Sequence, residues 1–182
     1  MRKLGLIFLV VLFTKTLSAQ EKKNSLYLEA GGNTIYYSIN YDRIIPLTPK
    51  LNLAPRAGFM YFPQSAFYDD SSFGDIRIPV ELNLLWSKNP NASNFLEGGI
   101  GMSFIQIKER VTYGTSTVET TTNAYGKVTL LRLGFRHQKP TGGLMYRAGI
   151  LVPIARDEYS QFRMGDDIFY VVWAGFSIGY SF

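Results

Sequence analysis

The chain ends in a long segment, Phe169 to Phe182 (FYVVWAGFSIGYSF), in which two kinds of residue alternate. The even-numbered positions are apolar or aromatic throughout, and the last of them is the terminal Phe182. A strand of a soluble protein usually spans about five or six residues. A tilted strand that crosses a bilayer needs about 9 to 11 residues with one face in lipid. The ending therefore predicts a membrane-spanning β-strand.

The first residues have the layout of a secretory signal peptide. Arg2 and Lys3 precede an apolar run, Leu4 to Phe13, and a short polar stretch then closes at Ala19. A transmembrane helix is the alternative, but this run is too short to cross a bilayer core. We expect cleavage after Ala19, which leaves a single barrel domain over residues 20–182.

Seven further segments repeat the period of two, and none of comparable length shows a helical stripe. The pattern predicts an all-β protein: an eight-stranded antiparallel transmembrane β-barrel, with an up-and-down meander order. The predicted strands cover residues 25–31, 35–45, 51–62, 76–86, 95–107, 127–137, 144–154 and 169–182.

The lengths of the predicted connections give an independent indication. Long segments at 63–75, 108–126 and 155–167 alternate with shorter turns, as in outer-membrane barrels, whose periplasmic turns are short. Gly32-Asn33 predicts a tight turn between the first two strands. The threonine-rich stretch from Val111 to Tyr125 is compatible with strands that continue beyond the membrane. Pro55 and Pro79 fall inside strands, where each removes a ladder donor, so we expect bulges or broken pairing there.

Charge and cysteine content exclude several classes of protein. Removing Arg2, Lys3 and Lys15 with the signal peptide leaves 16 basic residues against 14 acidic ones, and no run of like charges predicts nucleic-acid binding. The absence of cysteine means that disulfides do not hold an exported fold of this size together.

Three groups of motifs resemble a known family. They are Phe135 to Gly143 leading into Met145 to Gly149, Gly31 to Asn33 followed by Tyr37 to Arg43, and Gly179 to Phe182. They are similar to small porin-like outer-membrane β-barrel proteins of Gram-negative bacteria, in a Bacteroidetes-like form. The resemblance implies the fold and a location in the cell outer membrane. It also implies contacts with outer-membrane lipid, lipopolysaccharide and the barrel assembly machinery, and we expect a monomer whose surface partner is unknown.

The inward faces of the predicted strands carry most of the chemistry. Because an eight-stranded barrel is only wide enough for side chains to fill it, opposite charges there are expected to pair as a polar plug. An ion path is the alternative. The predicted lumen charge network consists of Glu29, Asp42, Arg56, Arg77, Glu81, Glu97, Arg132, Arg136 and Arg147.

Aromatic and apolar residues on the outward faces suggest two further roles. Phe176, Ile178, Tyr180 and Phe182 form the predicted C-terminal assembly signal. Amphipathic rings near strand ends predict the interfacial girdles of a membrane barrel. The predicted girdle residues are Tyr37, Tyr41, Tyr61, Trp86, Phe95, Phe104, Tyr170 and Phe182.

The sequence offers no catalytic constellation. His137 is the only histidine, it falls at a turn, and no serine nucleophile pattern accompanies it. We expect no enzyme activity, no cofactor and no metal site, and therefore a structural or surface-interaction role. The alternatives are a narrow passive pore for small solutes, a lipid-modifying barrel enzyme and a soluble lipocalin-like carrier. In the carrier the two faces would be exchanged, with arginines outside and aromatic residues inside.

Overall fold

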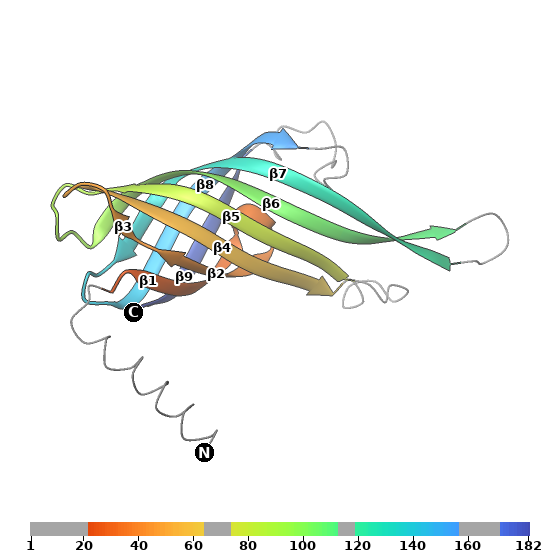
Figure 1. The fold of residues 1–182 in the computed structure, drawn as a ribbon, viewed down its shortest axis with the longest axis horizontal. Coiled ribbons are helices and arrows are strands. Elements are labelled where there is room, and N and C mark those ends of the chain that lie inside the picture. The colour runs from red at the N-terminus through yellow and green to blue at the C-terminus, as the bar shows by residue number, and fades with distance from the viewer. Residues whose placement is uncertain (1–21, 64–73, 113–118, 157–171) are drawn as a thin grey trace, which may run out of the picture.

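A computed structural model describes residues 22–63, 74–112, 119–156 and 172–182, and these form a closed antiparallel β-barrel (Figure 1). The strands are β1 (Asn24–Gly31), β2 (Tyr37–Arg43), β3 (Ile45–Pro46), β4 (Leu51–Pro63), β5 (Gly74–Trp86), β6 (Asn94–Thr112), β7 (Glu119–Gln138), β8 (Gly143–Arg156) and β9 (Trp173–Ser181). β2 and β3 both pair with β4 and together make one strand of the wall, so the barrel has eight strands. The predicted fold is confirmed.

Closure depends on the first and last strands. β1 pairs with β2 on one side and with β9 on the other, so that Leu28 lies opposite both Ile39 and Ile178. The register brings outward apolar residues of the three strands side by side, which fixes the pairing because a slip by one residue would reverse every side chain.

No helix among the described residues is long and apolar enough to cross a membrane.

The strand bounds differ from the predicted ones at a few places. The second strand begins at Tyr37 rather than at residue 35, because Gly32–Thr34 forms a 3-10 turn and Ile35 has a φ of 69°. The last strand is observed as Trp173–Ser181, and its predicted start at residues 169–171 lies outside the described residues. The predicted signal peptide, residues 1–19, also lies outside them.

The two ends of the barrel are built differently. At one end, which we call the turn end, the short connections 47–50, 87–93 and 139–142 lie close to Lys22 and Phe182. The opposite end, the loop end, carries a two-stranded ribbon of Ile107–Thr112 and Glu119–Ala124, which extends well beyond the barrel (Figure 1). Within the described residues, these two segments pair only with each other. The prediction of a long loop over 108–126 is therefore wrong for most of its length, whereas continued strands are confirmed.

Both prolines expected to disturb the ladders do so. The β4–β5 ladder pairs Ala57 with Val80 and then Met60 with Arg77, which leaves Pro79 without a partner on β4. On its other side, β4 pairs Arg56 with Asp42 and next Leu53 with Ile45, so Pro55 also falls in a gap. Proline lacks the N–H that a ladder needs, and the register is unchanged across both gaps.

The outer face of the barrel is apolar over the whole wall. Exposed side chains on five of the strands include Leu28, Ile39, Leu82, Leu133 and Ile178. Most predicted girdle residues are exposed there, namely Tyr37, Tyr41, Tyr61, Trp86, Phe104 and Phe182. The prediction that Phe95 belongs to the girdle is wrong. Phe95 lies on the same side of its strand as Glu97, faces inward and is buried. Tyr170 lies outside the described residues.

Candidate functional site in the barrel lumen

The nine charged residues of the inward faces are all buried inside the barrel, and none exposes more than 6% of its surface. Their neighbours along each strand point outward, because successive side chains of a strand alternate between its two faces. The arrangement excludes a carrier with exchanged faces, since the arginines lie inside and the aromatic and aliphatic residues outside. It also brings the charges of several strands into one space too narrow for bulk water.

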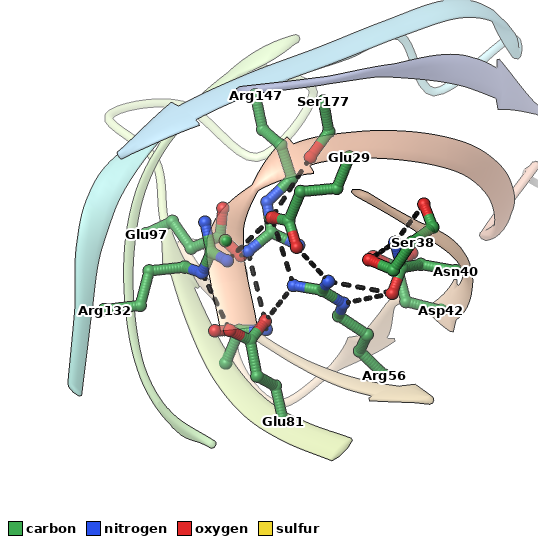
Figure 2. A network of polar contacts seen from close by, with 12 residues as sticks. Glu29, Ser38, Asn40, Asp42, Arg56, Glu81, Glu97, Arg132, Arg147 and Ser177 are labelled. Atoms are coloured by element: carbon green, nitrogen blue, oxygen red, sulfur yellow. Dashed lines mark hydrogen bonds and ion pairs between the residues drawn. The ribbon is translucent and has the colours of Figure 1, made fainter. Parts of the chain in front are cut away.

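Four side chains from four strands close into a ring of alternating charge at the centre of the lumen (Figure 2). The guanidinium of Arg56 on β4 bridges Glu29 on β1 and Glu81 on β5, with Nη1 2.6 Å from Glu81 Oε2. Arg132 on β7 bridges the same two carboxylates from the opposite side, at 2.7 Å from Glu29 and 2.8 Å from Glu81. Each charge therefore has two partners of opposite sign.

Polar neighbours add hydrogen bonds to the central ring. Asn40 on β2 accepts hydrogen bonds from Arg56 Nε and Nη2, at 3.0 and 2.8 Å, and Ser177 on β9 donates to Glu29 at 3.3 Å. Asn83 donates to Glu81 Oε2 at 3.1 Å. These neutral side chains satisfy positions that a charged partner does not reach, which reduces the cost of holding ions away from water.

Arg147 on β8 extends the ring toward the turn end. Its Nη2 lies 3.2 Å from Glu81 Oε2 and 3.0 Å from Glu97 Oε1 on β6, while its Nη1 donates to the hydroxyl of Tyr27 at 2.8 Å. The same hydroxyl donates to Asp42 Oδ2 at 3.0 Å. Tyr27 thus links the central ring to a second cluster.

The second cluster lies closer to the turn end and is a bidentate pair. Arg136 Nη1 and Nη2 each donate to one oxygen of Asp42, both at 2.7 Å, and Arg136 Nε donates to Gln138 Oε1 at 2.9 Å. Such parallel bonds are among the strongest that a carboxylate makes. Asp42 and Arg136 have 0% of their side-chain surface exposed.

The turn between β1 and β2 folds into the lumen at the loop end. Asn33 and Thr34 are fully buried, and the Thr34 carbonyl accepts a hydrogen bond from Arg77 Nη1 at 3.1 Å. Trp173 Nε1 donates to the carbonyl of Gly32 at 2.8 Å. The positive φ of Gly31 and Gly32, 71° and 66°, allows the chain to double back inward at this point.

Apolar layers lie on both sides of the charges. Ile44, Ala54, Leu85 and Phe95 form a cluster near the turn end. Toward the loop end a second cluster packs against Trp173 and consists of Ile105, Val128, Leu130 and Leu151. The ion pairs therefore lie between two water-excluding layers, where their attraction is screened less than at a surface.

Inward glycines make room for neighbouring polar side chains of the lumen. A Cβ added at Gly101 would lie 2.5 Å from Glu81 Cγ and from Asn33 Nδ2, and one at Gly99 would lie 2.0 Å from Asn83 Oδ1. In a barrel of this size, large inward side chains need neighbouring positions that have none. The side chains of the charge network thus occupy the space that the inward glycines leave open.

The lumen contains residues that the pattern of charges did not single out, above all Asn33, Thr34, Gln138 and Trp173. Gln138 has the same parity as Arg136, so the period of two contained a signal for it. The inward fold of the β1–β2 turn had no comparable signal. His137 lies outside the lumen, where its ring stacks on Tyr146 and contacts Asn94 Oδ1 at 2.6 Å. Within the described ranges, no group of three or more histidine, aspartate or glutamate residues is arranged to hold a metal ion.

The residues of the predicted assembly signal lie on the outer face of β9 and just after it. Phe176, Ile178, Tyr180 and the terminal Phe182 are between 39% and 58% exposed. Their alternation with the buried Ser177 and Ser181 continues to the end of the chain. Their role in assembly stays a prediction.

Comparison with known proteins supports the fold. No protein-family model matches the chain, and no curated protein sequence matches it. Among solved structures, the barrel is similar to the N-terminal β-barrel domain of Pseudomonas aeruginosa OprF, with a TM-score of 0.51 and 10% sequence identity. The alignment covers 88% of this chain and 96% of that one. At this identity the likeness concerns the fold alone, which is that of a closed eight-stranded antiparallel β-barrel.

Proposed function

We propose that the protein is a closed, non-conducting barrel of the outer membrane, which serves as a structural or surface-interaction protein rather than as a pore or an enzyme. The observation that carries this proposal is the ring of Glu29, Arg56, Glu81 and Arg132, whose ion pairs cross the lumen at its centre. An ion on the barrel axis would have to separate these pairs. The apolar layers on both sides add two further barriers, because dry constrictions of this kind stop ions.

The outer face supports the proposed location. Its exposed leucine, isoleucine and aromatic side chains cover a wall of strands that are long enough to cross a bilayer. Lipid and lipopolysaccharide are the partners that such a face requires. The exposed C-terminal residues, including Phe182, are the part of the chain that we expect the barrel assembly machinery to recognise.

A surface-interaction role is supported by the ribbon at the loop end. An isolated two-stranded hairpin is marginally stable in water. The ribbon nevertheless continues the β6–β7 ladder to the pair Thr112 and Glu119, well past the last pair of β5 with β6, Ile76 and Gln106. With the turn end in the periplasm, this ribbon extends outward from the cell.

Conductance in planar lipid bilayers tests the proposal. The unmodified barrel is expected to pass no steady current. A matched variant, Glu81→Gln, is expected to unfold more easily without acquiring ion selectivity. Steady, ion-selective conductance from the unmodified protein, with Glu81→Gln altering selectivity but leaving stability unchanged, would show that the charges line a path and that the protein is a narrow passive pore.

A further inference from the structure

A pocket of about 290 Å³ opens at the turn end of the barrel. Ile44 and Phe95 contribute to it, and both belong to the apolar layer inside the lumen. Its sides come from the three connections of this end, through Thr48-Pro49, Pro90 to Ala92 and Lys139-Pro140. The pocket is therefore the mouth of the lumen. It faces water along the barrel axis and is separated from the lipid-facing surface by the wall.

The pocket is lined by positive charge only. Lys22, Lys23 and Lys139 line it, and no aspartate or glutamate does. The surrounding turns add Arg43, Lys50 and Lys88, and no acidic residue stands in 22–24, 43–50, 87–94 or 137–143. Two carboxylates of this end already have partners among the described residues. Asp42 is buried and bonded to Arg136, and the C-terminal Phe182 accepts a hydrogen bond from the backbone N–H of Asn24.

The remaining lining residues provide hydrogen-bonding amides and apolar surface. Asn52 and Asn91 each offer both a donor and an acceptor, which matches the two groups of a peptide unit. Four prolines join Ile44 and Phe95 as apolar surface: Pro46, Pro49, Pro90 and Pro140. The buried Gln138 accepts a hydrogen bond from Arg136 and donates to the Lys22 carbonyl at 3.5 Å, so the lumen network also positions the rim.

We infer that this mouth is a binding pocket for the carboxylate end of a short peptide with an aliphatic terminal residue. Lys22 and Lys139 attract the carboxylate, the amides bond to the peptide unit, and the apolar floor takes the side chain. This is the combination of apolar lining and few polar groups that ligand pockets show. A free phosphate has no apolar group that could pack against the floor of the pocket. A lipid headgroup would have to leave the membrane surface to reach the barrel axis.

The test uses the protein extracted from membranes in a zwitterionic detergent and two pools of N-acetylated tripeptides, one with free carboxylates and one with C-terminal amides. Equilibrium dialysis followed by mass spectrometry of the retained peptides measures binding. We expect peptides of the carboxylate pool that end in leucine, isoleucine or valine to bind at least tenfold more tightly than their amides. Equal retention of the two pools would overturn the inference.

A pair of double variants separates the pocket from general attraction to a positive surface. Lys22→Gln/Lys139→Gln removes two charges that line the pocket, and Lys50→Gln/Lys88→Gln removes two charges of the same end that do not. We expect at least a tenfold loss of affinity in the first and less than a twofold change in the second. Equal losses of affinity in both double variants would mean that the peptides bind through general attraction to the positive surface, and would contradict the proposal.

Two further measurements complete the design. Ala92→Trp fills the pocket without changing its charge, so it is expected to abolish peptide binding while the barrel keeps its folded migration in unheated electrophoresis. Inorganic phosphate at the peptide concentration is expected to leave the peptide bound. Full displacement by phosphate would identify an anion site with no preference for peptides, and normal binding by the Ala92→Trp variant would place the peptide elsewhere.

Discussion

The two faces of the barrel wall have opposite chemistry although they belong to the same strands. On β7, Arg132 points inward and is 4% exposed, whereas its neighbour Leu133 points outward and is 64% exposed. In a soluble barrel these environments would be reversed, with the apolar residue inside. The difference is the one expected of a wall that faces lipid and encloses paired charge.

The two faces also differ in how closely each position specifies its side chain. In the proposed location an outward side chain meets fluid lipid, so many apolar residues are equivalent at a given position. An inward side chain meets particular partners, such as the two carboxylates that flank Arg56, so its length, charge and hydrogen-bonding geometry all matter. Substitutions on the inner face are therefore expected to be specific in their effects, and those on the outer face to follow polarity alone.

The largest effect is expected from breaking the inner network at its most connected carboxylate. Glu81 contacts Arg56, Arg132 and Arg147, so Glu81→Gln leaves guanidinium charge without its partner and should cost about 3–5 kcal/mol of the free energy of unfolding. Urea unfolding in micelles measures the loss. Adding Arg132→Gln in a double-mutant cycle should give a combined loss smaller than the sum of the single ones. Strict additivity would mean that the two side chains act independently.

A charge placed on the outer face should destabilise the barrel in a different way. Leu133→Arg exposes a guanidinium to lipid and is expected to cost about 2–4 kcal/mol if the residue lies near the bilayer midplane. Leu133→Phe, which keeps the position apolar, serves as the control and should fold like the parent. Refolding yields into lipid vesicles report both variants. Equal insertion of the arginine and phenylalanine variants would contradict an embedded outer face.

Two glycines on opposite faces provide a matched test of packing. A methyl group at the inward Gly134 would lie 2.4 Å from the carbonyl oxygen of Ala148, a backbone atom, whereas one at the outward Gly98 meets nothing within 4 Å. Overpacking typically costs about 1–3 kcal/mol, so Gly134→Ala should be destabilised by that order while Gly98→Ala stays close to the parent. A ranking in the reverse order would show that the backbone of the neighbouring strand β8 gives way easily at Gly134.

The smallest effect on the stability of the folded barrel is expected at the C-terminus, where the predicted consequence is on assembly. Phe182 is 39% exposed and pairs with Asn24 only through its backbone, so Phe182→Asp should lower the yield of inserted protein in cells more than it lowers the free energy of unfolding. His137→Ala, close to the same end, is the control and should insert normally. If the Phe182→Asp and His137→Ala variants both insert as well as the parent, Phe182 has no role in assembly.

The sequence by itself determined which way each side chain of the wall points. The period of two placed all nine charges inside and Phe176, Ile178, Tyr180 and Phe182 outside, because neighbouring residues of a strand have no other choice. It also located the ladder gaps at Pro55 and Pro79, since a missing N–H is a local property. For Phe95 the alternation and the chemistry disagree. Its aromatic ring favours the outer girdle, but it has the same parity as Glu97 and therefore faces inward.

Only the tertiary structure decided how those side chains meet. The partners of Glu81 come from the neighbouring strand β4 and from the more distant β7 and β8, and the stagger of the closed barrel sets which of the distant arginines reach it. The inward fold of the turn at 32–34 depends on donors that other strands supply: Arg77 donates to the carbonyl of Thr34, and Trp173 donates to the carbonyl of Gly32. Local patterns carry no information about such contacts, because they arise when the barrel closes and brings distant residues into a space too narrow to leave a charge unpaired.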